Sequence, residues 1–372
     1  MPEELVLLRN SERAKWRRCR QAHQWSYVEH RSAPRTKGAL LFGTDIHAAL
    51  RGWYPPGVKR GVHPAKTFDK IFKANREAYS QWDEEDNKID AYDLGMSMLE
   101  DYVDTYGTDD HIKIIQPEQV ITIDVMDRQG NYICTWVGQV DAMYEDLLRS
   151  TRSVPAIGAL EHKTAKSVKE ELSVISGYGE QGLSYYWAMD LHAHHNGLLP
   201  PDVHITHVKF NWLKKCLADN RPRNAQGHAL NKPTKPALIA ACDVRQLEVP
   251  RGATMAMLTD LLADAGVHVE LLGEPSARQS GPRFHRFDLI FRGNELQSIN
   301  KRIRAEAWEM AQAKAGKLPI YKNPTKDCDW DCEFKEVCEL HEMGQDWELM
   351  MDLEFSEWNP YEEHELELER AT

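Results

Sequence analysis

The 372-residue chain lacks several features that would place it in a specialised class of proteins. No apolar run reaches the length of about 20 residues that a membrane-spanning helix needs. No segment repeats at a fixed period, and no tract is dominated by one or two residue types. These absences exclude a membrane-spanning helix and a repeat architecture. We expect a globular protein with no membrane partner.

A secretory leader and a paired set of cysteines are also missing. The chain starts Met1-Pro2-Glu3-Glu4-Leu5, and its seven cysteines are an odd number. Disulfide frameworks occur in secreted proteins and use cysteines in pairs. We therefore predict a cytoplasmic protein without a disulfide framework.

The net charge of -12 is concentrated near the C-terminus. Residues 339–372 hold twelve Asp or Glu and one Arg, so the rest of the chain is almost neutral. We expect this acidic tail to be solvated and partly disordered. A sharper hypothesis is that the tail covers a basic surface or recruits a basic partner.

A basic surplus lies near the other end of the sequence. The segment from Arg9 to Lys37 holds nine Lys or Arg against Glu12 and Glu29. Such a density of positive charge can follow a phosphate backbone. Arg17 and Arg18 are the candidate contacts to nucleic acid within it.

Two short stretches carry residues typical of a metal site. Asp141 ends the run Gly138-Gln139-Val140-Asp141, and Glu161 and Lys163 lie in Leu160-Glu161-His162-Lys163-Thr164. Each stretch has the pattern of a strand, whose period of two places Glu161 and Lys163 on one face. Two carboxylates and an ammonium group can therefore converge.

This set of side chains suits a hard divalent cation. Mg²⁺ and Mn²⁺ prefer oxygen ligands, and one or two carboxylates leave room for waters and a phosphate. A neighbouring Lys can orient a water or offset charge on phosphate oxygens. The alternative is an ordinary solvated ion pair between Glu161 and Lys163.

Polar residues on two predicted helices add to these candidates. His47 lies one turn into a helix expected to start at Gly43, and its imidazole can be a further metal ligand. Gln181 and Tyr185 are one turn apart in a later helix and can contact nucleic acid. Each also has a plain structural interpretation, as a packed or surface side chain.

Four cysteines form a second signal. Cys328, Cys332 and Cys338 lie close together, and Cys19 lies near the opposite end of the chain. Four thiolates can hold an iron-sulfur cluster or a zinc ion. The spacing alone leaves both possibilities open.

The order of these residues, framed by the cysteines, resembles the RecB-type nucleases of the PD-(D/E)xK superfamily. It is most similar to their iron-sulfur branch, which includes CRISPR-adaptation exonucleases, AddB nuclease domains and many phage recombination nucleases. The resemblance extends from about Ser11 to Cys338, with a gap from Leu213 to Phe284. The three residues between Cys328 and Cys332 depart from the two that the family more often shows.

The resemblance implies a role for each candidate residue. The metal ligands would be His47, Asp141, Glu161 and the backbone carbonyl of His162. Lys163 would act as the catalytic lysine together with Asp141 and Glu161, and Gln181 and Tyr185 would position DNA. A [4Fe-4S] cluster that staples the two ends of the domain together would be ligated by Cys19, Cys328, Cys332 and Cys338.

The activity implied is Mg²⁺- or Mn²⁺-dependent hydrolysis of DNA phosphodiesters. The family favours an exonuclease on single-stranded or end-bearing DNA, with a recombination or replication protein as a further partner, in the bacterial host cytoplasm if phage-encoded. One alternative is a non-catalytic DNA-binding or assembly protein that keeps the fold. Another is a zinc-stabilised protein-interaction module with His23 or His341 as a ligand. The sequence does not fix the oligomeric state.

The pattern of elements predicts an α/β protein. The implied fold is the restriction-endonuclease-like αβββαβ core with a mixed central sheet, closed by the iron-sulfur staple. Glu118, on its first strand, can be an additional acidic group near the metals, but we expect it to be an exposed strand residue. The core helices are expected at 90–106 and 181–195, and the core strands at 111–125, 132–144, 157–164 and 203–213, with a hairpin turn at 127–131 between the first two strands. Later elements are expected at 255–265 and 295–315 (helices) and 283–291 (strand).

These elements predict five consecutive segments in one interwoven unit. They are an N-terminal helical segment with the first cysteine and the basic surface (1–42), a nuclease core (43–213), an insertion that is partly loop (214–292), a helix with the cysteine cluster (293–338) and the acidic tail (339–372).

Overall fold

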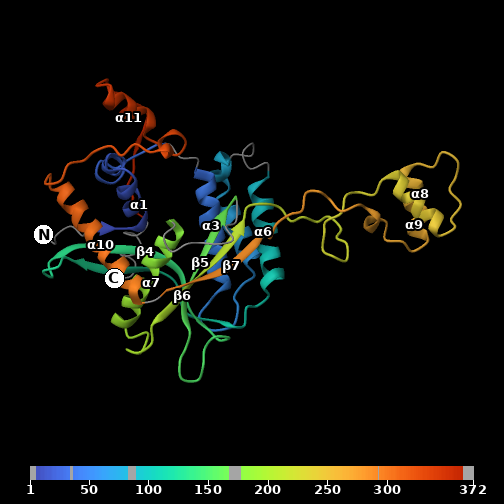
Figure 1. The fold of residues 1–372 in the computed structure, drawn as a ribbon, viewed down its shortest axis with the longest axis horizontal. Helices are drawn as coiled ribbons and strands as arrows, with labels where there is room; N and C mark the ends of the chain where they lie inside the picture. The colour runs from blue at the N-terminus through green and yellow to red at the C-terminus, as the bar shows by residue number, and fades with distance from the viewer. Residues whose placement is uncertain (1–5, 34–36, 83–88, 167–176, 292, 363–372) are drawn as a thin grey trace. The chain divides into compact units, whose positions relative to one another are not determined.

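The computed structural model describes residues 6–33, 37–82, 89–166, 177–291 and 293–362. The chain forms two compact units, so the expectation of one interwoven unit is wrong. Unit 1 comprises Met1–Lys215 and Phe284–Thr372, and unit 2 comprises Cys216–Arg283. Unit 1 is a mixed α/β structure, as the pattern of elements predicts. Figure 1 shows its strands between helices that cover both faces of the sheet.

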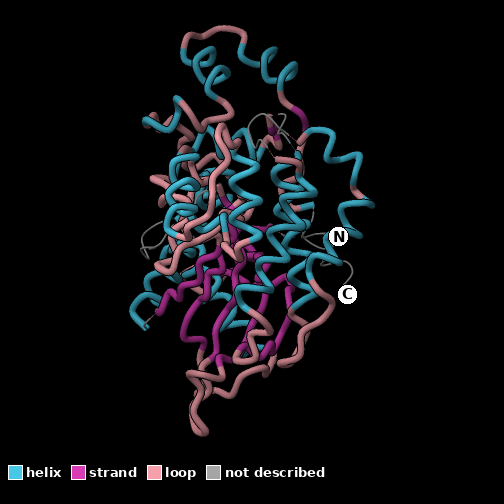
Figure 2. The backbone as a smooth tube through the Cα atoms, turned by 90° about the vertical axis from the view of Figure 1, so that its right-hand side faces the viewer, coloured by secondary structure: helices cyan, strands magenta, loops and turns pink. Residues whose placement is uncertain are grey.

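The main sheet of unit 1 is built from β1 (Leu7–Leu8), β3 (Ile112–Met126), β4 (Tyr132–Asp146), β5 (Ile157–Ala165), β6 (Ile205–Lys214) and β7 (Phe284–Ile290). Its order is β1-β4-β5-β6-β7, with β3 also paired to β4. The pairs β3–β4, β4–β5 and β6–β7 are antiparallel, whereas β5–β6 and β1–β4 are parallel. Figure 2 shows these strands side by side, so the prediction of a mixed central sheet is confirmed.

The remaining described elements of unit 1 are mostly helical. They are α1 (Asn10–Arg18), α2 (Arg20–His23), the π-helical η1 (Gln24–Val28), α3 (Lys37–Trp53), α4 (Pro64–Ala74), the 3-10 turn η2 (Arg76–Gln81), α6 (Ala91–Tyr106), α7 (Gly177–His195), α10 (Gly293–Lys314), the 3-10 turn η4 (Lys326–Asp329), α11 (Lys335–Glu342) and α12 (Trp347–Glu354), with a small sheet formed by β2 (Arg31–Ser32) and β8 (Ser356–Glu357).

The two longest strands, β3 and β4, are joined by a tight turn at residues 127–131. The Asp127 carboxylate accepts hydrogen bonds from the backbone N–H groups of Gln129 and Asn131, both at 2.8 Å. Gly130 has a φ of 87°, which a residue without a Cβ adopts at little steric cost. The local sequence therefore fixes this hairpin, and the predicted turn is confirmed.

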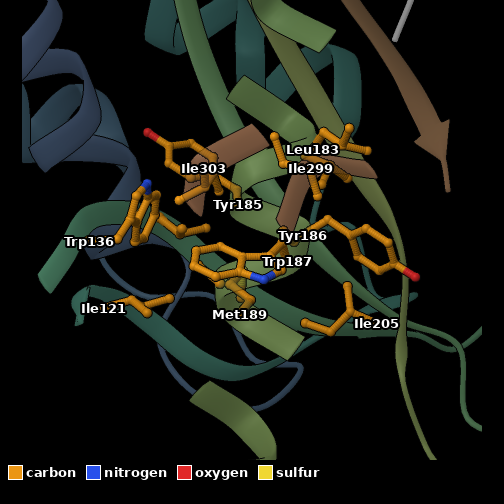
Figure 3. Packing of buried hydrophobic residues seen from close by; sticks show 14 of the residues in the cluster. Ile121, Trp136, Leu183, Tyr185, Tyr186, Trp187, Met189, Ile205, Ile299 and Ile303 are labelled. Atoms are coloured by element: carbon orange, nitrogen blue, oxygen red, sulfur yellow. The ribbon is translucent and has the colours of Figure 1, made fainter. Parts of the chain in front are cut away.

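One face of the sheet packs against α7 and α10. The buried residues of α10 recur every three or four positions, which places Ile299 and Ile303 on its inner side. Figure 3 shows both of them in the cluster that contains Trp136 of β4 and Trp187 of α7. The two indoles meet edge to face, with ring centroids 5.9 Å apart. This layer fixes α7, whose residues are candidates for the site.

The opposite face packs against α3, α4 and α6. Their core includes Phe42, Ile46, Phe68 and Leu94, all almost completely buried. A Cβ added to Gly95 would lie 2.2 Å from the ring of Phe68, so only glycine allows α6 to approach α4 this closely. The packing fixes the position of α3 over the sheet.

Residues 339–362 are folded, so the expectation of a solvated, partly disordered tail is wrong for this part of it. β8 pairs with β2, and apolar side chains lie between the acidic ones. Met351 and Phe355 are buried, and Phe355 stacks on Phe334 with ring centroids 4.9 Å apart. This burial gives the tail a core despite its charge. Residues 363–372 lie outside the part that the structure describes.

The tail also packs against the basic N-terminal segment. Asp352 forms an ion pair with Arg31 at 2.8 Å. The guanidinium of Arg9 lies over the rings of Trp358 and Tyr361, at 5.6 and 5.5 Å from their centroids. The acidic tail therefore covers part of the basic segment.

Unit 2 has a small core of its own. It contains α8 (Lys235–Val244), α9 (Met255–Asp264) and the 3-10 turn η3 (Val269–Leu272), packed around buried leucines. The predicted insertion, 214–292, is too long at its far end because β7 belongs to the sheet of unit 1. Among the described residues of the chain, no helix combines the length and apolarity needed to span a bilayer.

We predict that Phe355→Ala lowers the free energy of unfolding of unit 1 by about 3 kcal/mol, because it removes a buried aromatic ring from the tail's contact with Phe334. Urea denaturation followed by tryptophan fluorescence measures this change. The control is Leu353→Ala on α12, whose side chain is 73% exposed and should change stability by less than about 0.5 kcal/mol. Equal effects of the two substitutions would show that the tail does not pack as described.

Candidate functional site

The candidate site lies where β4 and β5 separate. Their antiparallel ladder runs from Glu145–Ile157 to Ala142–Leu160. Asp141 and Glu161 come immediately after the last pair, on strands that no longer bond to each other through the ladder. The Asp141 Oδ2 atom accepts the backbone N–H of His162 at 2.5 Å, which holds the two strands together at this point.

His47 reaches this point from α3. Its Nδ1 atom lies 2.9 Å from Asp141 Oδ1. A Cβ added to Gly43 would make an ordinary contact of 3.4 Å with Thr164 Oγ1, which shows that α3 passes next to β5 here. The helix begins at Lys37 rather than at the predicted Gly43, so His47 lies well inside it. The structure thus brings His47 and Asp141, 94 positions apart, into contact.

Glu161 and Lys163 lie on the same face of β5, as their spacing predicts. The Lys163 ammonium forms an ion pair with Glu161 Oε1. The other oxygen, Oε2, is buried and has no hydrogen-bond partner among the residues that the structure describes. A buried carboxylate oxygen without a partner is energetically costly and is suited to accept a cation or a donor from a ligand.

The charges of these groups depend on one another. Burial raises the pKa of Glu161, and the Asp141 carboxylate raises it further against the opposing effect of Lys163. Burial alone would lower the pKa of Lys163, but Glu161, Tyr185 and Asp141 together outweigh it and raise that pKa. The ammonium is therefore held in its charged form beside the acidic pair.

Asp141 and His47 form a second coupled pair. Burial alone would raise the pKa of Asp141, but His47 and the His162 N–H group hold it well below its usual range. Burial alone would lower the pKa of His47, and the Asp141 carboxylate outweighs this effect and raises it. Asp141 is therefore an anion at neutral pH, available as an oxygen ligand.

Glu118 is a third carboxylate at this site. It lies on β3 between the two ladder pairs that flank Asp141. Its side chain is only 7% exposed, so the expectation of an exposed residue is wrong. Gln139 donates to one of its oxygens, and the Nε atom of Arg51 lies 3.3 Å from the other. Burial raises the pKa of Glu118, and Asp141 raises it further.

The ring of His162 is anchored by a buried polar network behind the site. Its Nδ1 atom lies 2.7 Å from the Asn211 amide nitrogen, so the ring nitrogen accepts this hydrogen bond. Asn211 also accepts from Arg286, which binds Asp109 through two hydrogen bonds of 2.8 Å. Burial lowers the pKa of His162 to about 3, so the ring is neutral. The network fixes β5 between Glu161 and Lys163.

The helix α7 places Gln181 and Tyr185 next to the acidic groups. The Gln181 amide donates to the Tyr185 hydroxyl at 2.9 Å. Burial raises the pKa of Tyr185, and Glu161 raises it further against the effect of Lys163, which places the hydroxyl near both groups. The structure therefore gathers His47, Asp141, Glu161, Lys163 and Tyr185 at one location.

Arg17 and Arg18, in contrast, are engaged within the protein. Arg17 forms ion pairs with Glu180 and Glu306, at 2.9 and 3.3 Å. Arg18 pairs with Asp331 at 2.8 Å. These acids are far away in the sequence, so they do not offset the positive charge of the local segment when the sequence alone is considered. The two arginines have structural partners, and their contact with DNA stays a prediction.

The four candidate cluster cysteines line a single cavity of about 550 Å³. Burial raises the pKa of the Cys332 and Cys338 thiols, and the other thiols add to this effect. The Thr325 N–H group donates to Cys328 Sγ at 3.4 Å. Four thiols around one cavity, with a backbone N–H group donating to one of the sulfurs, fit a metal-thiolate group. Lys15, Arg18, Lys322 and Lys335 also line the cavity, each paired with an acidic side chain of the same lining.

Neither histidine proposed for a zinc site lines this cavity in the part of the chain that the structure describes. His23 lies 2.9 Å from Glu12 and is held there by a buried contact. His341 packs against the indoles of Trp25 and Trp347. The four cysteines are therefore the candidate ligands at this place.

A scan against protein-family models finds no match for the chain, and a search of curated proteins finds none either.

We predict that Cys332→Ser removes the brown colour and most of the iron from protein purified without oxygen, because one of four ligands is lost. Visible absorption together with iron and zinc analysis measures this. The matched control, Cys216→Ser in unit 2, should keep both colour and iron. A colourless wild-type protein that contains zinc would refute the iron-sulfur assignment.

Proposed function

We propose that the protein is a metal-dependent DNA nuclease of the RecB type, acting most readily as an exonuclease on single-stranded or end-bearing DNA. The observation that carries this proposal is the His47–Asp141 contact next to the Glu161–Lys163 ion pair, with the two carboxylates in electrostatic contact and one oxygen of Glu161 buried without a hydrogen-bond partner among the described residues. An imidazole and carboxylates of this kind bind Mg²⁺ or Mn²⁺ while leaving positions for water and phosphate.

The order of the elements supports the same proposal. The helix α6, the strands β3, β4 and β5, the helix α7 and the strand β6 follow one another as α, βββ, α and β. In the proposed nuclease core, Asp141 comes from the second of these strands and Glu161 and Lys163 from the third. The backbone carbonyl of His162 lies between them and would complete the ligand set.

Each side chain has a distinct task in the proposed reaction. When bound, Mg²⁺ or Mn²⁺ supplies Lewis-acid polarisation of the phosphate and lowers the pKa of a water. Lys163, kept charged by Glu161, stabilises the developing negative charge on the phosphate and orients the attacking water. Asp141 orients His47, and its hydrogen bond to the His162 N–H group fixes the distance between the two strands.

Gln181 and Tyr185 are placed to hold the DNA strand next to the reacting phosphate. The Tyr185 hydroxyl accepts from Gln181, and its own hydrogen would be donated to a phosphate oxygen. The proposed [4Fe-4S] cluster has a structural task, because its four ligands join the end of α1 to the segment that follows α10.

The decisive experiment is a cleavage assay with Mg²⁺ or Mn²⁺ on end-labelled linear DNA and on a closed circle. We expect the wild type to degrade the linear DNA. Asp141→Ala and Lys163→Ala should each reduce the rate by about 100-fold or more, since each removes a charge that acts on the transition state. Lys113→Ala, which changes an exposed lysine paired with Glu145 on the same sheet, should keep the wild-type rate.

Two results would overturn this function. Equal cleavage by the wild type and both site variants would show that the activity lies elsewhere. If the wild type binds DNA but does not cleave it with either cation, the protein is a non-catalytic DNA-binding or assembly protein that keeps this arrangement of residues.

We further predict that Tyr185→Phe raises the KM for DNA by about fivefold with a smaller change in kcat, because one neutral hydrogen bond contributes about 1 kcal/mol. Steady-state cleavage of a labelled oligonucleotide measures both constants. Tyr186→Phe is the matched control, because Tyr186 stacks on Phe291, 4.9 Å between centroids, and points away from Tyr185 (Figure 3). Equal changes in the two variants would remove Tyr185 from the DNA site.

A further inference from the structure

A second group of metal-ligating side chains lies at the other end of α7. Asp190 and His194 are four residues apart and therefore share one face of the helix. His204 lies just before β6, after a turn in which Gly197 has a φ of 65°. That turn brings His204 back against the helix. The three ligand atoms all lie within 4.8 Å of one another.

The distances between these atoms match a tetrahedral metal site. His194 Nε2 and His204 Nδ1 are 3.2 Å apart. Asp190 Oδ2 lies 3.1 Å from His204 Nδ1, and Asp190 Oδ1 lies 3.8 Å from His194 Nε2. Two ligands at the usual zinc distances and a tetrahedral angle are about 3.3 Å apart. One ion can therefore contact all three groups without a large movement.

The surroundings of the group favour a bound ion as well. Asp190 Oδ1 accepts the backbone N–H of Ile205 at 2.9 Å, which orients the carboxylate as outer hydrogen bonds do in metal sites. The His204 side chain is 56% exposed and the His194 side chain 25%, which leaves an entry path and an open position for water.

We propose that Asp190, His194 and His204 bind one zinc-class divalent ion that clamps the C-terminal turn of α7 to the start of β6. Two imidazoles and one carboxylate are ligands that transition ions prefer, whereas Mg²⁺ prefers oxygen alone. The site is therefore selective for a different metal from the one proposed at Asp141 and Glu161. It does not depend on nuclease activity.

The test uses the full-length protein and Co²⁺ as a visible probe for Zn²⁺. Titration of the wild type should show one bound Co²⁺ at this site. Its visible absorption spectrum should indicate nitrogen and oxygen ligands and lack a thiolate charge-transfer band. Zn²⁺ should displace it. His204→Ala should not bind this Co²⁺. Equilibrium dialysis should show that the variant binds one equivalent of Co²⁺ fewer than the wild type. The control His195→Ala, an exposed neighbour on α7, should bind as the wild type does.

Identical Co²⁺ stoichiometry and spectra in the wild type and His204→Ala would overturn the proposal. Circular dichroism shows whether each variant is folded. A second measurement needs no variant: crystals of the wild type grown with Zn²⁺ should give an anomalous peak between the three side chains. An absence of this peak would overturn the proposal even if His204→Ala failed to fold. Loss of nuclease activity is not a readout here, so failure of the two proposals can be told apart.

Discussion

The Asp141 carboxylate is the constraint on which the candidate site depends. A carboxylate that is mostly buried must have partners, because an unpaired charge in the protein interior is energetically costly. Asp141 uses one oxygen for His47 of α3 and the other for the backbone of β5. One side chain thus joins three elements that lie far apart in the sequence. The carboxylate and the imidazole are thereby held in place, which would reduce the reorganisation needed to bind the proposed cation.

A buried arginine joins the N-terminal and C-terminal parts of unit 1. Arg13 of α1 is fully buried and donates to Glu180 of α7 and Glu306 of α10, at 2.8 and 2.6 Å. Breaking such a pair leaves an uncompensated buried charge, so the three helices are fixed together. Because α1 leads directly to Cys19 and α10 leads towards Cys328, the same contact determines where the cysteines meet. The basic N-terminal segment therefore stabilises the fold.

The sequence predicted those features that depend on local pattern. Strand alternation and the turn at 127–131 gave the sheet, and the period of two placed Glu161 and Lys163 together. Features that depend on strand register or distant partners were missed. Glu118 was expected in solvent because its position opposite Asp141 could not be read from β3 alone. The acidic composition of the tail led to the wrong expectation of disorder, because a few apolar residues such as Phe355 determine its packing.

The helix α7 connects the cysteine cavity to the candidate site, because a helix is stiff. An α-helix rises about 1.5 Å per residue and keeps its side chains in a fixed angular order. Glu180 binds Arg13 of α1, while Tyr185 lies five residues further along, in electrostatic contact with Glu161 and Lys163. Asp190 lies another five residues on and accepts a hydrogen bond from the backbone of β6, the parallel neighbour of the strand with the site. A shift of α7 at any of these contacts must therefore move the other two, so the cysteine cavity and the carboxylates share one mechanical support.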